Sequence, residues 1–318
     1  MSAPAPPDGP VVAREATRHV PTRSPFGPED EIGMLNLAAA GVLSEVDPGR
    51  VFDLAVDYFP GMPCFTAGGD PPFQIWMSAT PDGMVRDDPL GVGEAQNRLL
   101  SRSADCMSMF LHTGTHVDAL NHVGYGGAVF NGFTAAEHLG SRHWHRAGAD
   151  RHPPVIARGV LLDVAALHGV DMLPPSHGIG TDELEAVLAR QGTELRVGDV
   201  VLVRTGRIRA WPDPEAFVPD EPGLDLDGAR LLAEAGAILI GADNVGLERH
   251  PSPDPGNWQP VHGFLLAEAG VPIMEIADLE ALAGEGVHEF AFIGACLKIR
   301  GATGSPMRPL ALPLRGRP

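Results

Sequence analysis

The chain has 318 residues, and its 23 Lys and Arg against 41 Asp and Glu give a formal net charge of −18. A phosphate backbone selects for a basic protein face, so this balance argues against a nucleic-acid partner and against a polybasic membrane anchor. Three cysteines without a CxxC pair exclude a disulfide scaffold and a four-cysteine zinc site. No apolar run approaches the roughly 18 residues of a membrane span, and the N-terminus lacks a signal-peptide pattern, so we expect a soluble, cytoplasmic protein.

The chain divides into a short tail and one long folded part. Residues 1–24 are rich in Pro, Ala and charge, which predicts a flexible N-terminal arm. No later stretch resembles a linker, so we expect residues 25–318 to form a single domain.

Alternating strand and helix patterns follow in chain order. The β-rich runs predict strands, and the 3.6-residue apolar period with a closing Gly predicts helices. Thr181 or Asp182 is the expected cap of the first helix. The pattern favours a mixed-sheet α/β (mixed α+β) fold. The expected strands are 51–56, 106–112, 159–165, 199–206, 237–243, 271–276 and 290–299, and the expected helices are 181–192, 225–236 and 261–270.

The most informative stretch is HTGTHVDALNH, which runs from His112 to His122 and also contains His116 and Asp118. A helix would turn Asp118 about 200° away from His116, and a fully extended chain would spread the segment over roughly 33 Å. The segment must therefore bend if these groups act together, and Gly114 is where bending is sterically cheap. Imidazole and carboxylate without thiolate suit Zn²⁺, Mn²⁺ or Fe²⁺, so we predict a metal site here.

A second pair, His262 and Glu275, flanks the expected helix 261–270 and the strand after it. The helix climbs roughly 12 Å and the strand returns a similar distance, so both side chains should reach the same edge of the fold. Other histidines, including the pair His143 and His145, are interpreted as surface or subunit contacts. Asp243 at a strand end is interpreted as a capping or turn residue.

At these residues the sequence resembles the kynurenine formamidase and cyclase family, whose signature is H-x-G-T-H-x-D-x-P-x-H. Leu120 stands at the family's proline position, and the segment PGMPCFTAGGDPPF resembles the family's P-x-W-P-G-D-x-P-F, with Phe65 near the tryptophan. The likeness covers about Phe52 to Ile299, and FGPEDEIGMLN resembles the start of the longer members. It implies a swivelling β/β/α fold and a metal-dependent hydrolase.

Carried over by residue, the resemblance implies one metal on His112, His116 and Asp118 and a second held or bridged by Asp118, His262 and Glu275. His122 would be the general acid/base, and Phe65 a wall of the substrate pocket. The family uses mostly zinc and in some members manganese, so one or two ions are expected, with Zn²⁺ first and Mn²⁺ second. The family commonly assembles, which implies a homodimer or homotetramer.

These residues predict hydrolysis of a carbon–nitrogen bond in an N-acyl or cyclic amide of a small, aromatic compound. A metal-activated water supplies the nucleophile, and a histidine titrating near 6.5 would protonate the leaving nitrogen. Two alternatives stay open: a polyketide-type cyclase or lyase that uses the metal to polarise a ketone, and a metal-binding protein without turnover.

Overall fold

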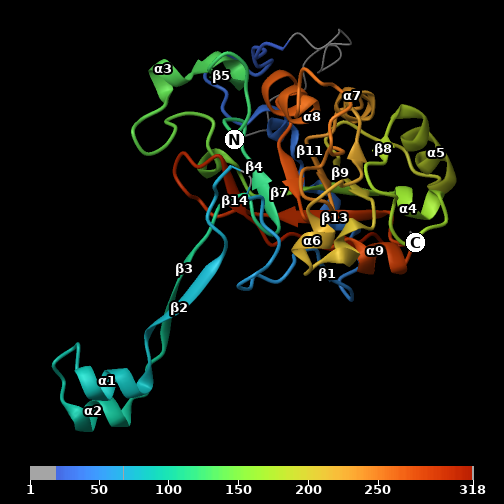
Figure 1. Cartoon of the computed structure of the whole chain (residues 1–318). Helices are drawn as coiled ribbons and strands as arrows, with labels where there is room; N and C mark the ends of the chain where they lie inside the picture. Colours follow the sequence, from blue (N-terminus) through green and yellow to red (C-terminus); the bar gives the residue numbers. More distant parts are fainter. Residues whose placement is uncertain (1–18, 67, 317–318) are drawn as a thin grey trace.

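A nine-stranded mixed sheet forms the centre of the molecule (Figure 1). The computed structural model describes residues 19–66 and 68–316, so most of the expected N-terminal arm, residues 1–18, lies outside the described residues. In spatial order the strands are β1 (Phe52–Asp53), β15 (Leu310–Pro313), β13 (Glu289–Gly294), β7 (Val155–Asp163), β9 (Val200–Arg204), β11 (Leu239–Ala242), β12 (Ile273–Glu275), β4 (His116–Asp118) and β14 (Gly304–Pro306).

The middle of the sheet is parallel and its two ends are antiparallel. β7, β9, β11 and β12 run parallel, whereas β13, β15 and β1 on one side and β4 and β14 on the other pair antiparallel. All five residues of β9 are buried, as expected for a parallel strand covered on both faces. The expected α/β fold class is confirmed.

Helices cover the parallel strands. α5 packs on β7 and on α7. α7 also packs on α8 and on the π-helical segment Gly263–Ala269, which directly follows α8 in the chain. The longer helices are α5 (Thr181–Gln191) and α7 (Leu226–Glu234), and the short ones are α3 (Ala135–His138), α4 (Val164–Leu167), α6 (Pro214–Phe217), α8 (Pro260–His262) and α9 (Glu280–Gly284).

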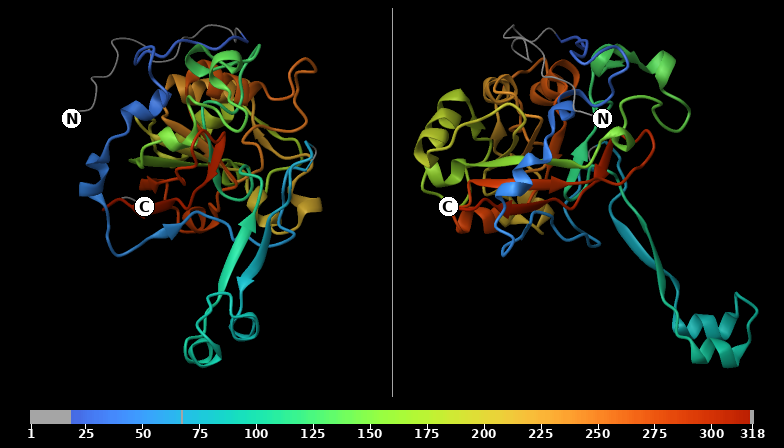
Figure 2. Two further views of the ribbon diagram at one scale, coloured as in Figure 1. Left: turned by 90° about the vertical axis from the view of Figure 1, so that its left-hand side faces the viewer. Right: turned by 180° about the vertical axis from the view of Figure 1, so that it is seen from behind.

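The chain segment between β1 and β4 forms an arm that projects from this body (Figure 2). It consists of the antiparallel pair β2 (Gln74–Ala79) and β3 (Ala104–Ser108), with α1 (Pro81–Asp87) and α2 (Glu94–Leu99) at its tip. The two helices were not predicted from the sequence, and a strand was expected at 106–112. β3 in fact ends at Ser108 and pairs only with β2.

One smaller expectation, the cap of α5, is corrected. The N-cap of α5 is Gly180, so neither Thr181 nor Asp182 is the cap. The N–H of Thr181, the first residue of the helix, donates to Asp227 Oδ2 at 3.1 Å. The remaining short pairs, β5 (Ala128–Val129) with β6 (Phe133–Thr134) and β8 (Gly178–Ile179) with β10 (Gly223–Leu224), lie outside the main sheet.

Candidate metal centre

The HTGTHVDALNH segment turns sharply before it enters β4. Gly114 has φ +64°, and a Cβ there would lie 2.5 Å from the ring of Tyr58, so only glycine fits this bend. The turn is fastened on both sides of Thr115: its hydroxyl donates to the carbonyl of Ile276 at 2.6 Å, and its carbonyl accepts the Tyr58 hydroxyl at 2.7 Å. The predicted bend at Gly114 is confirmed.

Strand register then brings the carboxylate of Glu275 to the histidine loop. β4 pairs antiparallel with β12, with Glu275 opposite His116, and paired residues of antiparallel strands present their side chains on one face. His262, the last residue of α8, reaches the same edge, with its Nε2 3.1 Å from Glu275 Oε1. The prediction that His262 and Glu275 meet is therefore confirmed.

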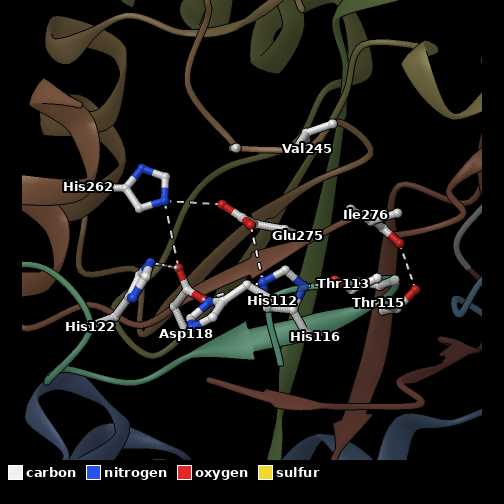
Figure 3. A network of polar contacts seen from close by, with 12 residues as sticks. His112, Thr113, Thr115, His116, Asp118, His122, Val245, His262, Glu275 and Ile276 are labelled. Carbon is white, nitrogen blue, oxygen red and sulfur yellow. Dashed lines mark hydrogen bonds and ion pairs between the residues drawn. The ribbon is translucent and has the colours of Figure 1, made fainter. Parts of the chain in front are cut away.

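Four side chains, His116, Glu275, His262 and Asp118, form a closed ring in which imidazoles and carboxylates alternate (Figure 3). Its edges are Asp118 Oδ1 to His116 Nε2 at 3.3 Å, His116 Nε2 to Glu275 Oε2 at 3.2 Å, Glu275 Oε1 to His262 Nε2 at 3.1 Å and His262 Nε2 to Asp118 Oδ2 at 3.6 Å. Donors at about 2.0–2.2 Å from a common ion lie roughly 3.0–3.5 Å from one another. The spacing of the ring is that of ligands around one dication.

Unpaired polar atoms at the ring point to the same conclusion. His116 Nε2, Asp118 Oδ2 and Glu275 Oε1 are buried and have no hydrogen-bond partner among the described residues. Buried polar atoms without partners are costly, and an ion would satisfy all three at once. The His116 Nδ1–H donates to the carbonyl of Gly114 at 2.8 Å, which leaves Nε2 facing the ring. These residues fit a divalent metal.

In the ring, the carboxylates and the imidazoles stabilise each other's charged forms. Burial alone would lower the pKa of His116, but contacts with Asp118 and Glu275 raise it to about 10. Burial likewise opposes ionisation of Asp118, yet the neighbouring histidines hold its pKa well below the usual range. In the absence of an ion, protons on the imidazoles therefore neutralise the carboxylates.

His112 lies beside the ring but is engaged at both nitrogens. Its Nδ1 is 2.6 Å from Asp118 Oδ1, and its Nε2 is 2.9 Å from Thr303 Oγ1. A separation of 2.6 Å is a hydrogen bond, shorter than the distance between two ligands of one ion. The structure thus places His112 as a partner of Asp118. Its expected role as a metal ligand stays a prediction.

His122 stacks on His112, with ring centroids 3.9 Å apart, and its Nε2 is 3.8 Å from Asp118 Oδ2. Its side chain is 25% exposed, whereas those of the four ring residues are at most 6% exposed. Burial and the nearby His112 and His262 lower the pKa of His122 to about 3. In the absence of an ion the His122 imidazole is therefore uncharged at neutral pH. Its expected role as general acid/base stays a prediction.

Phe65, the predicted pocket wall, belongs to the segment that leads into the arm and is 38% exposed. The preceding residue, Cys64, has its Sγ 3.3 Å from Thr113 Oγ1, so this segment runs beside the histidine loop. Phe110, an aromatic residue not singled out from the sequence, contacts the histidine loop, with its ring centroid 5.0 Å from that of His112.

Sequence reasoning also missed buried acids that surround the ring. Glu248 accepts a hydrogen bond from His262 Nδ1 at 2.6 Å, and Glu221, whose pKa burial and Glu275 raise well above its usual range, holds the backbone N–H groups of Val245 and Gly246. Asp243, expected to serve as a capping or turn residue, accepts the N–H groups of Thr205 and Gly206 and so holds the loop after β9 rather than its own turn. The signal available for Glu248 was an acidic residue shortly after a buried strand.

Another group, His168, His177 and Glu183, also brings three possible ligands together on the surface. Here both imidazole Nε2 atoms approach the same Glu183 oxygen, at 2.5 and 2.9 Å. These are hydrogen-bond distances, and the side chains are 22–38% exposed, so the group is a hydrogen-bonded surface cluster. His143 and His145 stack with centroids 5.3 Å apart and join no group of three donors in the described part of the chain.

The α/β fold carries a buried ring of two imidazoles and two carboxylates, which is the donor set of a divalent metal site. The comparisons with known proteins identify the family. The family model described as "Putative cyclase" matches residues 52–249, more than half of the chain, and the chain belongs to that family. The predicted family resemblance is confirmed.

Among its relatives, the isatin hydrolase of Roseibium aggregatum is 27% identical over 207 residues, which cover 63% of this chain and 71% of the relative. A crystal structure of a novel cyclase has a TM-score of 0.78 at 30% identity and covers 90% of this chain and 96% of its own. Isatin hydrolase A from Ralstonia solanacearum has a TM-score of 0.62 at 23% identity, covering 83% and 91% of the two chains, and shows the shared fold.

No helix among the described residues is both long enough and apolar enough to cross a bilayer.

Proposed function

We propose that this protein hydrolyses a carbon–nitrogen bond in a cyclic or N-acyl amide of a small aromatic compound. The observation that carries the proposal is the ring of His116, Asp118, His262 and Glu275 with an uncharged, solvent-accessible His122 at its rim. The relationship to isatin hydrolase supports a cyclic amide substrate. Phe65 and Phe110, near the histidine loop, supply aromatic surface for such a compound.

The ring residues are proposed to hold one divalent ion, with Zn²⁺ first and Mn²⁺ second. His112 would join them as a fifth ligand if its Nδ1 gave up the hydrogen bond to Asp118 and bound the ion instead. A second ion held by His112 would also require that hydrogen bond to break. When bound, such an ion lowers the pKa of a water molecule from about 15.7 to about 7 and polarises the substrate carbonyl.

His122 moves the proton in this scheme. Because its imidazole is uncharged at neutral pH, it accepts a proton from the attacking water while the new carbon–oxygen bond forms. The imidazolium then donates that proton to the leaving nitrogen as the carbon–nitrogen bond breaks. Asp118, 3.8 Å from His122 Nε2, stabilises the positive charge between the two transfers.

The test is turnover by protein freed of metal and reloaded with Zn²⁺ or Mn²⁺. Isatin, N-formylkynurenine and simple lactams are the substrates, and hydrolysis of at least one is expected. His122→Gln should retain the ion and lose activity by about 10²–10⁴-fold. A metal-loaded protein that opens none of these amides but closes a ring on a ketone substrate would instead support the cyclase alternative.

We further propose that the arm pairs with a second copy of the chain. Its side chains expose apolar surface along both strands and at the tip, including Ile75, Trp76 and Met77 at about half exposure and Leu99 at 87%. A two-stranded hairpin is marginally stable alone in water, and an apolar patch of this kind marks an interface.

Light scattering tests the assembly. The unaltered chain is expected to have at least twice the monomer mass, and Ile75→Asp should shift it toward monomer, whereas the neighbouring substitution Gln74→Asp should not. A monomeric unaltered chain would contradict the assembly and would leave the hydrolase proposal intact.

A further inference from the structure

Glu248 is buried at 1% exposure in the connection between β11 and α8. Its carboxylate accepts three hydrogen bonds, all from the start of the segment that carries His262. Oε1 accepts the Nδ1–H of His262 at 2.6 Å and its backbone N–H at 2.9 Å, and Oε2 accepts the backbone N–H of Val261 at 3.2 Å. One carboxylate therefore fixes both the backbone and the imidazole of His262.

The two nitrogens of an imidazole lie on opposite sides of the five-membered ring. A hydrogen bond that fixes Nδ1 of His262 therefore also fixes the direction of Nε2. With Nδ1–H bound to Glu248, Nε2 points toward Glu275 Oε1 at 3.1 Å and Asp118 Oδ2 at 3.6 Å (Figure 3). The other tautomer would place a hydrogen where a ligand lone pair is needed. The side chain of His262 is 2% exposed, so water cannot replace this hydrogen bond.

His116 shows that the arrangement around His262 is not the only way to hold a ligand. Its Nδ1–H donates to the carbonyl of Gly114, a neutral backbone acceptor within the same turn. His262 instead has a charged acceptor from a residue 14 positions earlier in the chain. A carboxylate partner makes the opposite nitrogen a stronger donor to a cation than a carbonyl does.

We propose that Glu248 is a positioning residue of the metal centre, which sets the tautomer and orientation of His262 and strengthens its bond to the ion. The inference rests on the metal site of the proposed function. Its readout is metal affinity and spectrum, so it is separable from turnover of any substrate.

The experiment measures Zn²⁺ affinity by competition with a chromophoric chelator for the full chain and three variants. Glu248→Ala should raise the Kd about 10–100-fold, as loss of partners of ligating histidines does. Glu248→Gln should raise it by a smaller factor, because the amide oxygen still accepts the Nδ1–H but carries no charge. The matched control is Asp243→Asn, which alters a buried carboxylate that holds backbone N–H groups of Thr205 and Gly206. It should leave the Kd within about twofold of the unaltered chain.

Cobalt(II) provides a spectroscopic readout that loss of stability alone would not move. The visible spectrum of the Co²⁺-loaded protein should change in Glu248→Ala and remain unchanged in Asp243→Asn. Glu248→Gln decides the matter if Glu248→Ala does not fold. Folded variants at Glu248 with unaltered Kd and spectrum would overturn the inference while the metal site stands, and an unaltered chain that binds no divalent ion overturns both.

Discussion

Metal binding by this protein should release protons, and the number follows from the ring. Contacts with Asp118 and Glu275 raise the pKa of His116 to about 10, and contacts with Glu248 and Glu275 raise that of His262 well above its usual 6.5 despite burial. Both imidazoles are therefore protonated near neutral pH in the absence of an ion. An ion can bind their Nε2 atoms only after both protons leave, so we expect about two protons released per ion.

The cost of this exchange can be worked out for His116. Near pH 8 its pKa lies about two units above the solution pH, so removing its proton costs about 3 kcal/mol. That cost falls by about 1.4 kcal/mol for each unit of pH. The proton on His116 alone should make the affinity for Zn²⁺ rise about 10-fold per pH unit between about pH 7 and pH 8, and the proton on His262 should steepen that rise.

Calorimetric titration with Zn²⁺ in two buffers of different ionisation enthalpy counts the released protons directly. His122→Gln is the matched control, because the pKa of His122 is about 3 and its imidazole has no proton to release. The count should stay the same in this variant. An affinity that is flat with pH, or release of fewer than about half a proton, would refute the argument that protons occupy the ring.

Three further outcomes are expected. In Gly304→Ala the new Cβ would lie 2.6 Å from His112 Cε1, and displacing that imidazole by roughly 1 Å should lower kcat/KM about 100-fold, whereas Gly284→Ala, which enters open space in α9, should leave it unchanged. Burial lowers the pKa of His152 to about 4, so the unfolded chain binds a proton that the native chain does not between pH 6.5 and pH 4. The free energy of unfolding should therefore fall by about 2 kcal/mol from pH 6.5 to pH 5, and denaturation of His152→Gln should show a smaller fall. Asn131 donates to the carbonyls of Gly27, Pro28 and Asp30, so Asn131→Ala should lower the midpoint of chemical denaturation by an amount worth about 2–3 kcal/mol, and an unchanged midpoint would contradict a structural role for these bonds.

Parts of the site could be predicted from the sequence where their geometry depends on residues close together in the chain. The bend at Gly114 follows from steric cost at a single residue, and the convergence of His262 with Glu275 follows from the rise of a helix and the return of a strand. The parallel strands were predictable for the same reason, because their apolar runs are continuous along the chain.

The hydrogen bonds and pKa values of the site depend on residues that are distant in sequence, so they follow only from the tertiary structure. That His112 binds Asp118 and Thr303 through its two nitrogens follows from the approach of residues up to 191 positions apart. Burial and the distant His262 lower the pKa of His122, and neither can be inferred from the HTGTHVDALNH segment alone. The role of Glu248 could not be predicted for a similar reason. A single acidic residue in a loop acquires this role only when folding buries it and brings His262 beside it as a hydrogen-bond partner.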